Sequence, residues 1–260
     1  MAVSPASPDD AVEIIGPGVG REPLILTCEH ASRRVPRPLR SSAADREILA
    51  SHWGYDIGAA TVTREVVRRT GSLALLARFS RLVCDANRHA EDATWIRREV
   101  EGQVLSFNAR VDAAEIGRRR RRYYEPYHHA VDEVLRRRLA AGGDVLLLSV
   151  HSFTPVFGED RRDMEVGVLF NDHAAVAQRL ERALAATGLR AALNEPYSGR
   201  QGMMFAAQRH GTIHNVVYLE IELRQDLLAT PAQARRMGAA LADCLQQLRV
   251  RHRERPARGG

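Results

Sequence analysis

Acidic and imidazole side chains stand where three apolar runs of the chain end. Glu29 and His30 follow the first run, and His151 follows the second. The third run leads to Glu220 and Glu222. Imidazole nitrogens and carboxylate oxygens are ligands that zinc favours, and the same groups act as general acids and bases. The pattern predicts one polar centre at one edge of a sheet.

His30 and His151 are the candidate nitrogen ligands of that centre, because two histidines at two strand ends favour zinc or another divalent metal over a purely structural role. The carboxylate ligand is open between Glu29 and Asp56. Neighbouring residues on a strand point to opposite faces, so Glu29 could join His30 only if the strand turns. Asp56 follows an intervening loop, and its alternative role is that of a helix N-cap.

Two carboxylates on the third run are candidates for a general base. Glu220 and Glu222 share one face of a strand through the two-residue alternation of side chains. Glu222 lies nearer the carboxyl end, where the metal is expected, and we predict that it is the base. For Glu220 we expect a structural pairing with an arginine.

A compact polar segment from Ser80 to Arg88 has the composition of an anion site. Arg81 and Arg88 offer planar guanidinium forks that match a carboxylate, and Asn87 adds a donor. Asp85 is expected to orient one of these arginines. The alternative for any one of them is an ion pair that only holds the loop.

A second polar loop runs from Asn194 to Arg200 and contains a glycine. Such a loop can close over a small anionic substrate, with Arg200 as a further contact. His210 follows shortly afterwards, and we expect it to stabilise an oxyanion or to donate a proton. These two expectations rest on weaker patterns than those for the strand ends.

The elements that must position these residues alternate between strands and helices. Apolar runs predict strands at 12–15, 24–28, 73–76, 82–84, 144–150, 165–169 and 216–223. Helical spacing predicts helices at 43–52, 56–70, 108–141 with a break near Pro126, 174–187 and 232–248. This order predicts a single three-layer α/β domain over residues 23–250, with a mixed, mostly parallel sheet covered by helices on both faces. Residues 1–22 are expected to be loose apart from their short strand, and 251–260 to form a disordered arginine-rich tail.

The amino-acid composition indicates to which broad class of protein the chain belongs. The chain has 260 residues, of which 45% are hydrophobic and 27% charged, as in ordinary globular proteins. Its net charge is +6, and all 38 basic residues are arginines. The arginine runs lack interleaved aromatics, which favours solvated helix faces over a nucleic-acid surface. Without a membrane-length apolar run, a signal-peptide pattern or a cysteine framework, we expect a cytoplasmic protein.

Six stretches, in this order, resemble the N-formylglutamate amidohydrolase family. They are Cys28 to Ser32 with Val35-Pro36, His52 to Asp56, Ser80 to Arg88, His151 to Pro155, Asn194 to Arg200, and Glu222 to Leu227. The resemblance implies a zinc-carboxypeptidase-like fold and zinc-dependent removal of the formyl group from N-formyl-L-glutamate. The products would be formate and glutamate, as in histidine breakdown.

The resemblance also bears on the site residues. It supports His30 and His151 as ligands and Glu222 as the base, and it implies that Arg81, Asn87 and Arg88 hold a substrate carboxylate. It leaves Asp56 and Glu29 as alternatives. The residue before the first histidine and the loop near Arg200 differ from members assigned to histidine breakdown. The alternatives are therefore a deacylase of another N-acyl amino acid and a binding protein for acidic amino acids without turnover.

Overall fold

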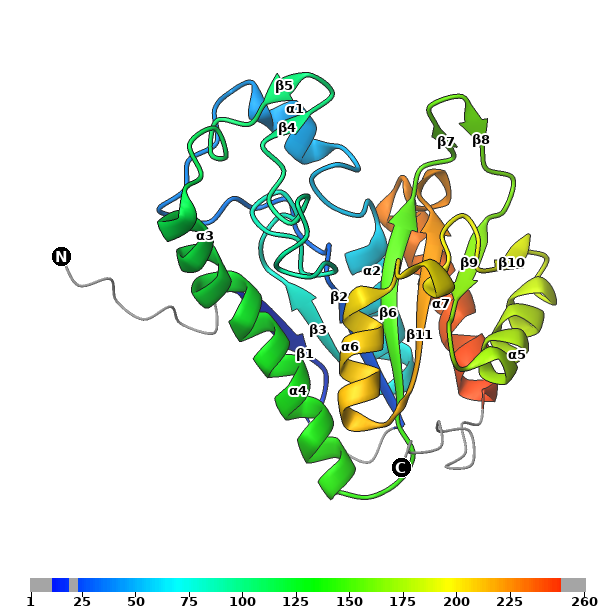
Figure 1. Ribbon diagram of the computed structural model, residues 1–260. Coiled ribbons are helices and arrows are strands. Elements are labelled where there is room, and N and C mark those ends of the chain that lie inside the picture. The colour runs from blue at the N-terminus through cyan, green and yellow to red at the C-terminus, as the bar shows by residue number, and fades with distance from the viewer. Residues whose placement is uncertain (1–10, 19–22, 249–260) are drawn as a thin grey trace.

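Seven strands form one mixed sheet through the middle of the molecule, as the computed structural model in Figure 1 shows. The structure describes residues 11–18 and 23–248. The order across the sheet is β1 (Val12–Ile15), β3 (Leu73–Ala77), β2 (Leu24–Cys28), β6 (Leu146–Phe153), β11 (Val217–Arg224), β9 (Val166–Leu169) and β10 (Ala191–Leu193). β3, β2, β6 and β11 are parallel, and β10 is parallel to β9. β1 and β9 run antiparallel to β3 and β11, which confirms a mixed, mostly parallel sheet.

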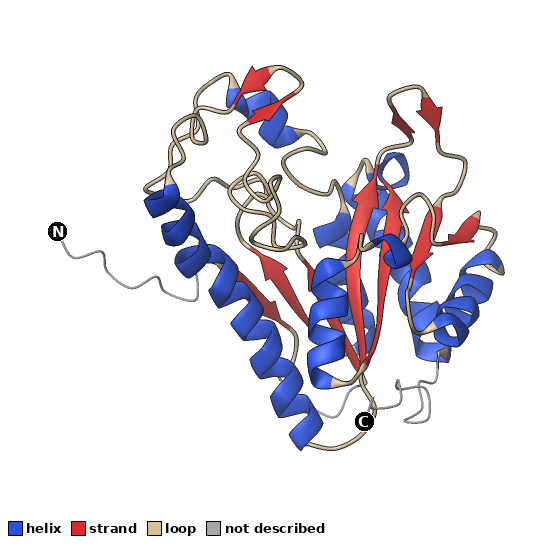
Figure 2. Ribbon diagram, viewed as in Figure 1, coloured by secondary structure: helices blue, strands red, loops and turns tan. Residues whose placement is uncertain are grey.

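Helices cover both faces of this sheet and enclose two apolar layers (Figure 2). On one face, α4 (Glu125–Ala140) and α6 (Phe205–His214) pack on alternate side chains such as Leu75 and Leu147. On the other face, α2 (Ala59–Thr70), α5 (Ala174–Ala185) and α7 (Pro231–Gln247) pack on side chains such as Leu76 and Leu148. Because strand side chains alternate between faces, one apolar run can serve both layers. The expected three-layer α/β architecture is confirmed.

The helical pattern predicted over residues 108–141 forms one continuous helical rod that has an irregular middle segment. It comprises α3 (Ala113–Arg119), a π-helical segment (Arg120–Tyr124) and α4. Asp112 caps α3 by accepting a hydrogen bond from the backbone N–H of Glu115 at 2.7 Å. Pro126 lies in the first turn of α4, directly after the π-helical segment. Its lack of a backbone N–H is tolerated at this position. The expected break near Pro126 is therefore a change of helical winding.

The predicted strand at 82–84 is wrong, because these residues form a buried turn. Their side chains pack into the core, but side chains from other segments of the chain donate hydrogen bonds to the backbone carbonyls of Leu82 and Val83. Asn108 donates to the carbonyl of Leu82, and Arg119 donates to that of Val83, both at 2.8 Å. An apolar run alone does not reveal such partners, which replace the hydrogen bonds of a strand ladder.

Several short elements were not predicted. They are β10, α6, the 3-10 turns Gly199–Gln201 and Gln225–Leu228, and the two hairpins β4 (Glu99–Val100) with β5 (Gln103–Val104) and β7 (Val156–Phe157) with β8 (Asp160–Arg161). The helix expected over 43–52 is the shorter α1 (Asp45–Ala50). Both hairpins project at the same end of the molecule (Figure 1), where the loops that follow β2 and β6 also gather. Within the described ranges, no helix combines the length and apolar character that a bilayer crossing requires.

The described residues include only part of the two terminal segments that the sequence predicts, 1–22 and 251–260. β1 pairs with β3 at the edge of the sheet, as expected for residues 12–15. The remaining loose segment lies largely, and the arginine-rich tail wholly, outside the described residues. The stretch 23–248 supplies the other six strands of the sheet and all the helices named above.

Candidate functional site

The chain turns as soon as β2 ends, and this turn directs both Glu29 and His30 toward His151. Residues 29 and 30 lie in a turn, and the carbonyl of His30 accepts a hydrogen bond from the backbone N–H of Asp56 at 3.0 Å. His151 lies on β6, beside β2 in the sheet. The turn removes the strand alternation that would have separated the neighbours Glu29 and His30. All four side chains are buried.

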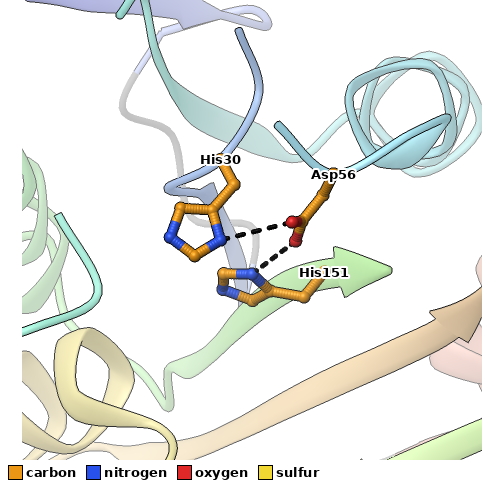
Figure 3. Close-up of side chains that lie close together, drawn as sticks. All are labelled: His30, Asp56 and His151. Carbon is orange, nitrogen blue, oxygen red and sulfur yellow. Dashed lines mark hydrogen bonds and ion pairs between the residues drawn. The ribbon is translucent and has the colours of Figure 1, made fainter. Parts of the chain in front are cut away.

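Figure 3 shows the carboxylate of Asp56 facing the Nδ1 nitrogens of both histidines. Its Oδ1 lies 3.4 Å from Nδ1 of His30, and its Oδ2 lies 2.8 Å from Nδ1 of His151. One ligand atom from each of the three residues lies within 4.8 Å of the others. The structure thus groups Asp56 with the histidines. Asp56 does not cap α2, whose N-cap is Gly58.

Each imidazole contacts a further carboxylate, a different one for each histidine, through its other nitrogen, Nε2. Nε2 of His30 lies 2.6 Å from Oδ1 of Asp85, and Nε2 of His151 lies 3.1 Å from Oε2 of Glu29. Each Nε2–H can donate to its carboxylate, which leaves the Nδ1 lone pair directed at Asp56. Glu29 therefore lies behind His151 as an orienting partner, not among the three grouped ligand atoms.

Glu29 is itself held in its ionised form. Ser149 donates to its Oε2 at 2.5 Å, and the hydroxyl of Tyr127 donates to its Oε1 at 3.0 Å. Burial alone would raise the pKa of Glu29, but hydrogen bonds from His151 and Ser149 lower it to about 2. A charged Glu29 fixes the imidazole of His151 and increases its basicity.

The donor set fits a divalent cation. Among the described residues, no group forms a hydrogen bond with the buried Nδ1 of His30, which lies 3.4 Å from Oδ1 of Asp56. Buried carboxyl groups surround the two histidines, namely those of Glu29, Asp56, Asp85, Glu220 and Glu222. In their ionised form, so many carboxyl groups are costly in a protein interior unless a cation compensates their charge. Two imidazoles and one carboxylate are a set of ligands that zinc takes in catalytic sites.

Glu222 lies beside His151 across the parallel pair β6–β11, where the two residues are register partners. It lines the cavity at this centre, and its buried Oε2 has no hydrogen-bond partner in the part of the chain that the structure describes. Burial raises the pKa of Glu222 to about 8. A carboxyl group with an unused oxygen at the cavity wall has the properties of a proton acceptor and donor.

Glu220 lies two residues earlier on the same face and is enclosed. Asn87 donates to its Oε2 at 3.2 Å, and Nε2 of His151 lies 3.6 Å from the same oxygen. Its structural partners are thus an amide and an imidazole, where the sequence suggested an arginine. The carbonyl oxygen of the Asn87 side chain accepts the backbone N–H of Ala206 at 2.8 Å, so this amide joins β11 to the start of α6.

Asp85 connects the histidine centre to the arginines. Its Oδ2 accepts from Arg81 at 2.9 Å and from Arg88 at 3.3 Å. Arg81 also lies 3.6 Å from Asp56. Burial alone would raise the pKa of Asp85, but its interactions with His30 and Arg81 hold this pKa well below its usual range. Both guanidiniums line the cavity, together with Asn87.

The cavity above the three grouped residues has a volume of about 400 Å³. Its polar wall includes Arg81, Arg88 and Arg97, and its other walls are largely aromatic, with Trp53, Phe153, Phe157, Tyr197 and Phe205. Three guanidiniums in one small cavity favour an anionic ligand. Sequence reasoning missed Arg97 because it lies outside the compact segment from Ser80 to Arg88.

Two predicted site residues lie away from the cavity lining. His210 is buried on α6, with Nδ1 at 2.7 Å from Asp132 and Nε2 at 2.8 Å from His128. Its imidazole is enclosed by protein on both sides, so the structure does not bring His210 together with the other predicted site residues. Arg200 packs its guanidinium over the ring of Phe170 at 5.1 Å, while Tyr197 of the same loop and the following Gly202 and Met203 line the cavity.

The arginine runs on the helices are largely occupied by acidic or backbone partners. Arg118 pairs with Glu115 at 2.7 Å, and Arg136 and Arg137 pair with Glu133. Arg119 is buried and binds backbone carbonyls. These contacts are those of ion-paired helix faces.

Comparison with known proteins gives one family and a shared fold. The sequence model of the family described as N-formylglutamate amidohydrolase matches residues 22–229. No curated protein matches the chain. The crystal structure of gene product Atu2144 from Agrobacterium tumefaciens is similar, with a TM-score of 0.83 and 28% identity over 94% of this chain and 98% of that one. N-formylglutamate amidohydrolase from Ralstonia eutropha JMP134 shares the fold, with a TM-score of 0.70 and 19% identity over 92% and 98%.

Proposed function

The chain belongs to the N-formylglutamate amidohydrolase family, and we propose that it is a metal-dependent hydrolase that cleaves N-formyl-L-glutamate to formate and L-glutamate. The same proposal assigns it to histidine breakdown. The observation that carries it is the buried group of His30, Asp56 and His151 at a cavity whose wall bears three arginines. The histidine group suits a metal, and the arginines suit a substrate with carboxylates.

His30 and His151 would hold the metal through their Nδ1 atoms, with Asp56 as the third ligand. Zinc is our choice, because this mixture of nitrogen and oxygen donors matches its catalytic sites. A cation bound there supplies Lewis acidity, which polarises a carbonyl oxygen and makes water easier to deprotonate. Asp85 and Glu29 keep the two imidazoles in the tautomer that offers Nδ1.

Glu222 would move the proton in this reaction. It accepts a proton from the water whose oxygen bonds to the formyl carbon, and it returns that proton to the amine nitrogen as the C–N bond breaks. Its raised pKa of about 8 suits the second of these tasks. Beside a bound cation its ionised form is favoured, which suits the first.

Arg81, Arg88 and Asn87 would orient the substrate. Arg88 and Arg81 share Asp85 as a partner, so their guanidiniums are held in place before a ligand arrives. A preorganised fork binds a carboxylate with less loss of side-chain entropy. The α-carboxylate of the amino acid is the group that we assign to this pair.

A formate-release assay tests the proposal. Purified metal-loaded protein should release formate from N-formyl-L-glutamate, and Glu222→Gln should lower kcat by about 100- to 10,000-fold while metal analysis finds the metal retained. Absence of formate release by the metal-loaded wild type would contradict the proposed activity. Unchanged kcat in Glu222→Gln would contradict the role of Glu222 alone.

A further inference from the structure

The three cavity arginines differ in whether the protein already neutralises them. Arg81 pairs with Asp85 and Asp56, and Arg88 pairs with Asp85 and Asp92. Within the described part of the chain, Arg97 has no carboxylate partner. It is therefore the guanidinium of this wall whose charge is left for a ligand.

Arg97 is nevertheless held in place. Its guanidinium carbon lies 5.6 Å from the centroid of the Trp53 ring, and both residues line the cavity. Stacking on a ring face leaves the N–H groups along the guanidinium edge available to a ligand. The backbone carbonyl of Arg97 accepts a hydrogen bond from the side chain of Asn108 at 2.5 Å, which anchors the residue from behind.

The backbone also brings Arg97 close to the other two arginines. The N–H of Asp85 donates to the carbonyl of Trp95 at 2.9 Å, so the segment that carries Arg97 lies against the start of the segment that carries Arg88. Burial, with the charges of Arg88 and Arg81, lowers the pKa of Arg97 from its ordinary value. A second negative charge in the cavity would relieve this repulsion between like charges.

We propose that Arg97 binds the side-chain carboxylate of the substrate and thereby restricts the site to N-acyl derivatives of acidic amino acids. The inference rests on the proposed function for the position of the amide at the metal centre. With the α-carboxylate at Arg88, a dicarboxylic amino acid presents its second carboxylate to another part of the same wall. Arg97 offers that carboxylate a cation without an internal competitor.

N-formyl-L-glutamate and N-formyl-L-glutamine test this assignment, because they have nearly the same shape and differ in one charge. Wild-type protein should show a higher kcat/KM for the glutamate compound by about 10- to 100-fold, the value of a charged hydrogen bond. Arg97→Gln should remove this preference by lowering kcat/KM for the glutamate compound alone. Arg97→Lys should retain part of it, and Arg46→Gln, which alters an exposed arginine on α1, should retain all of it.

Binding of the two free amino acids separates this inference from the proposed function. By calorimetry, wild-type protein should bind L-glutamate more tightly than L-glutamine, and Arg97→Gln should bind them equally. This result would support the inference even if the wild type released no formate, a failure that would overturn the proposed function alone. Equal binding by the wild type, or a preference for glutamate that survives Arg97→Gln, would overturn the role of Arg97.

Discussion

Asp85 holds His30 with one carboxylate oxygen and the cavity arginines with the other. Its Oδ1 lies 2.6 Å from Nε2 of His30, and its Oδ2 accepts from Arg81 and Arg88. A single buried carboxylate thus orients a candidate metal ligand and the candidate anion site. Removal of its charge should affect both functions together.

Asp85→Asn should therefore weaken metal binding by about 10- to 100-fold, as expected for loss of a carboxylate that orients a ligating histidine. It should also raise KM, because the two arginines lose their common partner. Metal titration and steady-state kinetics measure the two effects. The control is Asp92→Asn, which removes a partner of Arg88 without a contact to His30. If Asp92→Asn lost metal to the same extent, the link through His30 would be incorrect.

Metal should stabilise the folded protein, because the unfolded chain does not assemble His30, Asp56 and His151. We expect Tm of chelator-treated protein to rise with added zinc and to keep rising with concentration above the dissociation constant. Asp56→Asn should reduce this shift, since it removes the ligand between the two imidazoles. Thermal scans at several zinc concentrations provide the measurement. An equal shift in Asp56→Asn would show that zinc binds elsewhere.

Acid should destabilise the protein through His128 and His210, a buried histidine pair outside the cavity lining. Burial holds the pKa of His128 well below its ordinary value, so this imidazole stays neutral in the folded state. The unfolded chain takes up the proton near pH 6.5, and stability is lost as the pH falls through that value. Between pH 7.5 and 5.5 the contribution is about 1.4 kcal/mol.

His128→Phe should reduce the loss of unfolding free energy between these pH values by that amount. Urea unfolding at both pH values gives the difference, which does not depend on the absolute stability of the variant. His129→Gln serves as the control, because His129 is the exposed neighbour on the same helix. A pH dependence unchanged by His128→Phe would place the acid sensitivity in other groups.

Arg119 should be a main support of the loop that carries the arginines. It is buried, and it donates to the carbonyls of Val83 and Phe107 and to the side chain of Asn108. Arg119→Met should cost about 3 kcal/mol or more of unfolding free energy, because it leaves several buried acceptors without a charged donor. Arg118→Met, which removes an exposed partner of Glu115, should cost about 1 kcal/mol or less. Equal losses would contradict this account.

The sequence predicts the sheet and the strand ends well, because both depend on patterns that are local in the chain. Apolar runs and helical spacing locate β2, β6 and β11 and four of the helices that cover the sheet, namely α2, α4, α5 and α7. Since parallel strands end at one edge of a sheet, the meeting of His30, His151 and Glu222 follows from these runs. No local sequence pattern predicts the turn at residues 29 and 30.

The remaining parts of the site depend on contacts between distant residues. The positions of Asp56 and Glu29 depend on a hydrogen bond between two loops, and Asp85 reaches His30 across 55 positions of the chain. His210 has a residue type suited to catalysis, but the packing of α6 against α4 gives it Asp132 and His128 as partners. Arg97 has no motif around it, and its stacking on Trp53 appears only in the folded chain.

The measurement that tests the central claim most directly is formate release during removal and return of the metal. Protein dialysed against a chelator should lose formate release from N-formyl-L-glutamate, and titration with zinc should restore it to a plateau at one zinc per chain. Asp56→Asn should need more zinc to reach its plateau. Full activity in protein shown by elemental analysis to contain no metal would contradict the assignment of His30, Asp56 and His151 as a catalytic metal centre.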